Sequence, residues 1–144
     1  MLNNFITLED SQYCTIGYNT KSNILFTHWK EATAKLTDEL YKELSKRRLD
    51  FLAQYKSNKI LTDTQKFYFT VSPELQAWVA EHTLKTMQIA GVKKIAIIVS
   101  EEFIASLSIE QTMEEPEAKP FQTRYFGTQN EAIEWLEETN AVIV

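Results

Sequence analysis

The sequence contains few of the residues that build the commonest metal, redox and disulfide sites. Its 144 residues include one cysteine, Cys14, and two histidines, His28 and His82. A single cysteine excludes an intrachain disulfide and a cysteine-based metal cluster, and it favours a reducing compartment, so we expect a cytoplasmic protein. The histidines are isolated from each other and from any cluster of further ligands at zinc-site spacing. We therefore expect no metal ion and no cofactor.

Glycine is equally scarce, with three in the chain. The glycine-rich phosphate loops G-x-G-x-x-G and G-x-x-x-x-G-K are absent, and so is the G-x-S-x-G turn of layered serine hydrolases. No other catalytic constellation is visible, so we expect a protein that is not an enzyme.

Positive charge and long apolar runs are lacking as well. The net charge of −5 argues against general binding to nucleic acid or to an anionic membrane surface. No apolar run approaches the length of a membrane span, and the N-terminus lacks the basic start and apolar core of a signal peptide. We predict no integral membrane segment.

What the chain does contain is an alternation of strand and helix patterns. Residues 1–11 are polar and read as a short lead-in. Residues 13–18 and 24–29 are rich in aromatic and β-branched side chains, and the polar link between them predicts an antiparallel hairpin. Three further strands are predicted, at residues 59–63, 95–99 and 121–126.

The first predicted helix begins after Thr37, which is well suited to cap it. It has an apolar stripe at helical spacing, formed by Leu40, Leu44, Phe51, Leu52 and Tyr55. The basic run Lys46-Arg47-Arg48 interrupts this stripe, and we interpret it as a solvated face with the side-chain stems lying on the surface. The alternative is a small patch that binds an anion or a partner.

The second predicted helix extends from Pro73 to about Ala90, with Ser72 as N-cap, and ends at Gly91. It carries two adjacent apolar stripes: Leu75, Trp78, Val79, His82, Thr86 and Ile89 in one, and Ala77, Ala80, Leu84 and Met87 in the other. So wide an apolar surface predicts burial on two sides, against another helix, a second subunit or a ligand.

Two more helices complete the pattern. Ser100 is predicted to cap the third, with Glu101 and Glu102 in its first turn and Phe103, Ile104 and Leu107 facing inward. A capping box, Thr128 to Glu131, begins the last one. The apolar tail, residues 141–144, is expected to pack on the sheet edge or on a partner. The order β-β-α-β-α-β-α-β-α predicts an α/β fold, with a mixed, mainly parallel sheet, in a single domain of residues 1–144.

The segment from Lys59 to Pro73 is where we expect function, because loops after the carboxyl ends of strands commonly carry ligands and switches. Asp63 ends a strand, and its simplest role is to accept hydrogen bonds from the amides of Thr64 and Gln65. The aromatic residues Phe67, Tyr68, Phe69 and Trp78 are either core or the wall of an apolar pocket. Tyr68 is the one we expect to be most exposed. His82 is expected to stack on Trp78, which lies one helical turn before it.

The element order and several landmarks resemble those of the STAS domain and the SpoIIAA-like proteins, a group related in fold to the CRAL-TRIO lipid carriers. The resemblance extends from Tyr13 to about Glu138. It is carried by the opening hairpin, the strand 60–63 that ends in an acid, Trp78, the apolar strand 95–99, and the closing strand and helix 126–136.

This resemblance implies a non-enzymatic regulatory or protein-interaction module that acts in bacterial signalling. The candidate interaction or switch residues are Asp63, Phe67, Tyr68, Phe69, Ser72 and Trp78. By analogy with the family's phosphorylated serine, Ser72 is either a switch or a plain N-cap; its turn lacks the glycine of the family pattern. The expected partner is another protein or a second subunit. The alternative function is a carrier or sensor of a lipid or other apolar small molecule.

Overall fold

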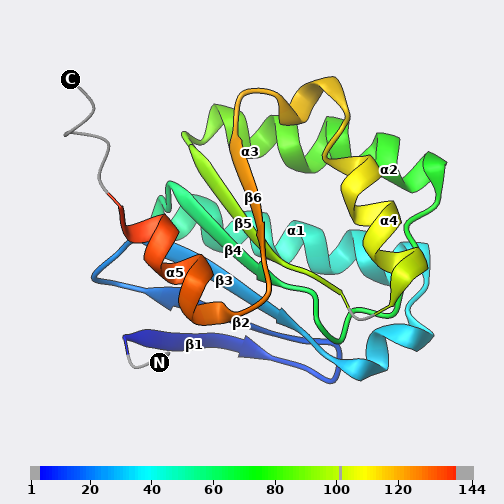
Figure 1. The fold of residues 1–144 in the computed structure, drawn as a ribbon, viewed down its shortest axis with the longest axis horizontal. Coiled ribbons are helices and arrows are strands. Elements are labelled where there is room, and N and C mark those ends of the chain that lie inside the picture. The colour runs from blue at the N-terminus through cyan, green and yellow to red at the C-terminus, as the bar shows by residue number, and fades with distance from the viewer. Residues whose placement is uncertain (1–3, 101, 139–144) are drawn as a thin grey trace.

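The computed structural model describes residues 4–100 and 102–138. Its centre is a six-stranded sheet in which the strands lie side by side in chain order (Figure 1). The strands are β1 (Phe5–Asp10), β2 (Cys14–Asn19), β3 (Ile24–Trp29), β4 (Lys59–Asp63), β5 (Lys94–Ile98) and β6 (Gln122–Phe126). β1, β2 and β3 pair antiparallel, and β3 to β6 pair parallel. The predicted α/β class with a mixed, mainly parallel sheet is confirmed.

Helices cover both faces of this sheet. They are α1 (Asp38–Tyr55), α2 (Pro73–Val79), α3 (Lys85–Ile89), α4 (Phe103–Thr112) and α5 (Gln129–Glu137), with a π-helical segment η2 (Ala80–Leu84) and the 3-10 helices η1 (Glu31–Lys35) and η3 (Pro116–Ala118). Helices α1 to α4 enclose the larger core, and α5 covers the opposite face over a smaller one (Figure 1). Within the described ranges, no helix is long and apolar enough to cross a membrane. The tail 141–144 and Glu101 lie outside the described residues.

The helix starts follow the predicted capping chemistry. The hydroxyl oxygens of Thr37, Ser72 and Thr128 each accept a hydrogen bond from the backbone N–H three residues later, at 3.2, 3.2 and 3.3 Å. Each bond satisfies one of the amides that the first turn of a helix leaves without a partner. Because these caps fix where α1, α2 and α5 begin, they also fix which residues meet the sheet.

The lead-in predicted for residues 1–11 is wrong, since residues 5–10 form the edge strand β1. A bulge lies between Thr7 and Glu9 in its pairing with β2. Phe5 packs toward the smaller core and Leu8 toward the larger one, since residues three positions apart lie on opposite faces of a strand. Each face of β1 therefore contributes one partly buried apolar residue, and Ile6 is exposed, so the sequence lacks the run of alternating apolar residues that marks a half-buried strand.

The predicted helix from Pro73 to Ala90 is confirmed as a continuous helical region, but its two stripes are not both buried. The N–H of Lys85 donates to the carbonyl of Ala80, five residues back, as in a π-helix. This widened turn rotates the later residues, so the inward face passes from Leu75 and Val79 to Leu84 and Met87. His82, Thr86 and Ile89, predicted in the first stripe, are exposed.

The prediction for α4 is wrong in orientation. Phe103, Ile104 and Leu107 point outward, with exposed fractions of 74%, 51% and 40%. The buried positions are Ala105, Ser108 and Thr112. These small side chains allow the helix to pack closely. Ser108 Oγ also accepts the Val71 N–H at 3.1 Å, and the need to satisfy this buried amide favours the face of α4 that carries Ser108.

The predicted cap of this helix also differs. The helix begins at Phe103, and Ser100 lies before it in a turn. Its hydroxyl donates to the carbonyl of Phe67 at 3.0 Å and accepts the N–H of Glu102 at 3.1 Å. Ser100 therefore connects the start of α4 to residues 66–71, which we call the aromatic loop, rather than capping the helix.

Candidate functional site

Asp63 lies at the carboxyl end of β4 and is 1% exposed. Its Oδ1 accepts the Gln65 N–H at 3.0 Å, as predicted for its role in the loop. Its Oδ2 accepts a hydrogen bond from Gln129 Nε2 at 2.7 Å and lies 3.1 Å from His28 Nδ1. Burial acts to raise the pKa of Asp63, but these hydrogen bonds outweigh it and hold the pKa below its usual value. Asp63 therefore stays ionised and fixes the ring of His28.

This group opens into a polar pocket with a volume of ≈ 340 Å³, at the end of the sheet where α5 begins. Its lining includes His28, Asp63, Gln65, Thr128 and Gln129. Among the described residues, Nε2 of His28 has no hydrogen-bond partner, so this nitrogen is available for a hydrogen bond with a ligand. The lining contains no serine, cysteine or lysine, and Thr128 is already bonded to Glu131. The pocket therefore has an oriented base without a nucleophile.

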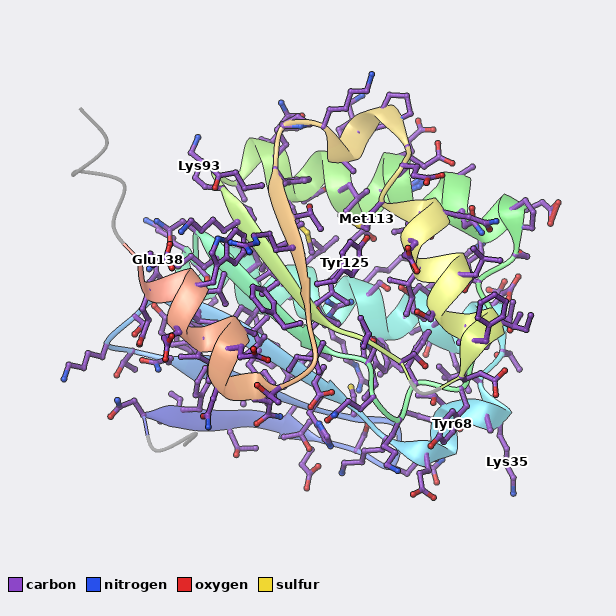
Figure 2. All side chains as sticks on the ribbon, viewed as in Figure 1. Lys35, Tyr68, Lys93, Met113, Tyr125 and Glu138 are labelled. Carbon is purple, nitrogen blue, oxygen red and sulfur yellow. The ribbon has the colours of Figure 1, made fainter. Side chains whose placement is uncertain are left out.

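The predicted aromatic residues divide between core and surface. Phe67 is buried, and its ring packs edge-on against Trp29, Tyr41 and Phe69. Tyr68 and Phe69 are half-buried, and Figure 2 shows Tyr68 at the same end of the molecule as Lys35, away from Lys93 and Glu138.

The other two predicted site residues, Ser72 and Trp78, are half-buried. His82 stacks on Trp78 as predicted, with the rings 4.8 Å apart. The Asp63 carboxylate lies on the α5 side of the sheet, whereas Phe67 belongs to the core on the other side. The six predicted residues therefore do not form one surface.

A second site lies inside the larger core, between the sheet and helices α1 to α4. It is a cavity of ≈ 90 Å³ with mainly apolar walls, formed by residues such as Ile60, Ile95, Met87 and Ile109. Two polar side chains stand out in this lining because neither is fully satisfied.

The first is Arg48, on α1. The prediction of a solvated basic run holds for Lys46 and Arg47, which are exposed, and is wrong for Arg48, which is 7% exposed. Its Nε donates to Thr27 Oγ1 at 3.0 Å, and its guanidinium carbon lies 5.5 Å from the centre of the Trp29 ring.

Arg48 has no anion to balance its charge. Within the described chain, its terminal nitrogens have no hydrogen-bond partner, and no carboxylate forms an ion pair with it. The positive charge of Arg48 acts on two weakly acidic groups, the Tyr41 phenol and the Cys14 thiol. Burial raises the pKa of each, although Arg48 acts in the opposite direction. Both groups therefore stay neutral at physiological pH, and the cation remains uncompensated.

The second is Thr83, in the π-helical segment η2. Its hydroxyl is buried and has no hydrogen-bond partner. π-Helical turns are rare and are found frequently at functional sites. Here the extra residue turns Thr83 toward the cavity and away from the exposed face of the helix.

The outer face of α4 forms an exposed apolar area, which we call the α4 surface: Phe103, Ile104 and Leu107, with Tyr125 of the neighbouring strand β6. Burial together with the charges of Glu110 and Glu114 raises the pKa of Tyr125 to about 12. These acids therefore lie close to Tyr125 and border the surface on one side. Figure 2 shows Tyr125 directed into the space between β6 and α4.

Sequence reasoning missed Arg48 and the pairing of His28 with Asp63, although signals for both were present. Arg48 lies four residues after Leu44 and four before Leu52, which places it on the buried stripe of α1. His28 and Asp63 are partners in the register of two adjacent parallel strands. That pairing required knowing which strands are neighbours.

A comparison with protein families gives a match. A family model described as SpoIIAA-like matches residues 28–137, more than half of the chain. The matched range includes the last two residues of β3, strands β4 to β6 and helices α1 to α5, and with them the polar pocket, the cavity and the α4 surface. Searches of curated proteins and of solved structures each found no match.

Proposed function

Since the chain belongs to the SpoIIAA-like family, we propose that it is a regulatory module of the STAS type, acting in the bacterial cytoplasm by binding a protein partner rather than by catalysis. The observation that carries this proposal is the α4 surface. An exposed phenylalanine, isoleucine and leucine on one face of a helix make an apolar area of the kind that marks interaction sites.

The charges around this surface indicate the chemistry of the partner. Glu110 and Glu114 border it, and the chain as a whole has a net charge of −5. A partner segment with apolar anchors flanked by lysine or arginine complements both features. A second copy of the chain would bring the same acidic border, so we favour a basic heterologous partner over a homodimer.

The aromatic loop is bonded to the start and the inner face of α4, and we include the predicted contact residues in the same proposal on that ground. Ser108 on α4 accepts the Val71 N–H, and Ser100 donates to Phe67, so the loop and the helix are joined by hydrogen bonds. Tyr68, Phe69 and Ser72 would then form the rim of the interface. A phosphate on Ser72 would lie at the α2 N-terminus and add negative charge that attracts a basic partner.

The experiment compares three forms of the full chain as baits in a native lysate: wild type, the double variant Phe103→Ser with Leu107→Ser, and Ile89→Ser. Ile89 is a matched control because it is 80% exposed and lies on α3, away from the α4 surface. We expect a protein that wild type and Ile89→Ser retain and the double variant loses. That protein, purified, should bind with an affinity that falls as salt rises.

Two results would contradict this proposal. One is that no protein distinguishes the double variant from Ile89→Ser. The other is a concentration-dependent dimer in sedimentation that the double variant abolishes, because the occupant of the surface would then be a second copy of the chain.

The cavity supports a second candidate function, a carrier or sensor of an apolar small molecule. Its walls include Ile109 and Thr112 of α4, so a ligand there would contact the helix whose outer face forms the α4 surface. A module of this kind would sense a small molecule on one side of α4 and present a partner site on the other. Native mass spectrometry of protein purified from its own cells should then show a bound small molecule, and a spectrum of ligand-free protein alone would count against it.

A further inference from the structure

We propose that the cavity is a binding site for a short-chain carboxylate, whose carboxylate group is held by Arg48 and Thr83 and whose alkyl group lies against the apolar walls. The inference rests on the second candidate function and specifies the charge, the polar anchors and the size of the ligand. Three independent observations lead to it.

The first observation is the uncompensated charge of Arg48. A buried guanidinium is costly unless an anion and hydrogen-bond acceptors replace its lost water. Among the described residues, Thr27 is the one hydrogen-bond acceptor of the guanidinium, through Nε, and no carboxylate forms an ion pair with Arg48. A ligand carboxylate can accept two parallel hydrogen bonds from one guanidinium, which is the geometry that arginine is suited to recognise.

The second observation is the Thr83 hydroxyl. It is a buried donor without an acceptor, and it lines the same cavity as Arg48. The two residues come from different elements, α1 and η2, which pack against each other. A carboxylate has enough acceptor sites to serve the guanidinium and the hydroxyl together. One anion bound between them would therefore serve both of the incompletely satisfied polar groups named in this lining.

The third observation is the size and polarity of the cavity. Its volume of ≈ 90 Å³ is smaller than the ~150 Å³ cavity that holds a benzene molecule, so a long acyl chain does not fit entirely within it. The walls are mainly apolar and carry one cation. A monoanion with a short alkyl group matches that combination, whereas a phosphate dianion would exceed the available positive charge.

The test is isothermal titration of the full chain with three probes: sodium butyrate, its neutral analogue butyramide, and sodium octanoate. We expect butyrate to bind, and butyramide and octanoate each to bind at least about tenfold more weakly, since one lacks the charge and the other exceeds the volume. Arg48→Met should weaken butyrate binding by about ten- to a hundredfold. Thr83→Val, which removes the hydroxyl at constant shape, should weaken it by about three- to tenfold.

Thr123→Val is the matched control. The Thr123 hydroxyl is also buried without a partner, but Thr123 does not line the cavity, so its removal should leave butyrate affinity unchanged. If Thr123→Val weakened butyrate binding as much as Thr83→Val does, the role of Thr83 would be refuted, because removing any buried hydroxyl would then have the same effect.

The remaining outcomes separate this inference from the function on which it rests. Equal binding of butyramide and butyrate, or unchanged binding in Arg48→Met, overturns the anion site while an apolar ligand site survives. Tighter binding of octanoate overturns the size limit. Absence of binding by all three probes at millimolar concentration overturns both the inference and the second candidate function.

Discussion

Replacing Arg48 by methionine should make the ligand-free protein more stable, although it removes several contacts. Methionine keeps most of the unbranched stem that packs in the core, and it removes a guanidinium that is 7% exposed. The removal loses the hydrogen bond to Thr27, worth about 1.5–3 kcal/mol, and the contact with the Trp29 ring, worth about 1–2 kcal/mol. Against these losses stands a desolvation cost of several kcal/mol for a buried cation without an anion.

The balance favours the variant, because replacing even a buried ion pair by hydrophobic side chains is often neutral or stabilising by about 1–4 kcal/mol, and among the described residues Arg48 has no carboxylate to offset its desolvation. For a chain of this length, each kcal/mol corresponds to about 3 °C in Tm. Urea unfolding of wild type and Arg48→Met, followed by tryptophan fluorescence, measures the difference. Arg47→Met is the matched control: Arg47 is exposed and pairs with Glu9 at 2.8 Å, so its loss should change the free energy of unfolding by no more than about 1 kcal/mol.

The same pair of variants connects stability with ligand binding. Butyrate should raise the Tm of wild type and of Arg47→Met, and leave that of Arg48→Met unchanged. A destabilisation of Arg48→Met by more than about 1 kcal/mol would refute the reasoning, since the guanidinium would then be well satisfied without a ligand.

Three further predictions concern groups elsewhere in the fold. Asp63 has a lowered pKa in the folded protein, so its stabilising contribution is present above its ordinary pKa and is lost as pH falls through the lower folded value. Asp63→Asn should therefore reduce the free energy of unfolding at pH 7 and reduce it less in acid. An equal loss at both pH values would contradict this. Cys14 is buried with a raised pKa, so a thiol reagent should label it only as fast as the protein unfolds; rapid labelling of the native state would disprove its burial. Tyr125 should ionise near pH 12 in an ultraviolet titration, and Glu110→Gln should lower that value; no change would place Glu110 away from the phenol.

Much of the fold could be predicted because it depends on local chemistry. Strands β2 to β6 follow from apolar, β-branched runs, and the starts of α1, α2 and α5 follow from capping side chains. These signals reside in adjacent residues. The errors came where a pattern is weak or changes phase. Strand β1 packs one apolar residue toward each core, Phe5 and Leu8, and the π-helical turn at Ala80 rotates the second half of its helix.

The orientation of α4 illustrates a different limit. Phe103, Ile104 and Leu107 are the more hydrophobic residues, yet Ala105 and Ser108 face inward because they fit closely and satisfy the Val71 amide. The small size of the inward side chains and the hydrogen bond to Val71 outweigh hydrophobicity in α4. Neither can be predicted without knowing which segment of the chain packs against the helix. The apolar residues left outside then become a candidate contact surface.

The candidate sites were predictable only in part for the same reason. Asp63 was singled out because it ends a strand, but its bonds to His28 and Gln129 join residues far apart in the chain. Arg48 was assigned to a basic run on the surface, because charge was weighed above its spacing from Leu44 and Leu52. Buried arginine side chains are rare, so helical spacing alone does not predict that Arg48 is buried. The cavity beside Arg48, which explains its burial, is formed by residues far apart in the sequence.

The most direct test of the anion site is a crystal structure of the protein grown with 3-bromopropionate, whose bromine gives an anomalous signal. We expect one bromine peak inside the cavity, with the carboxylate within hydrogen-bond distance of the Arg48 terminal nitrogens and the Thr83 hydroxyl. A cavity that contains only water, or a bromine peak at the molecular surface with Arg48 unchanged, would contradict it.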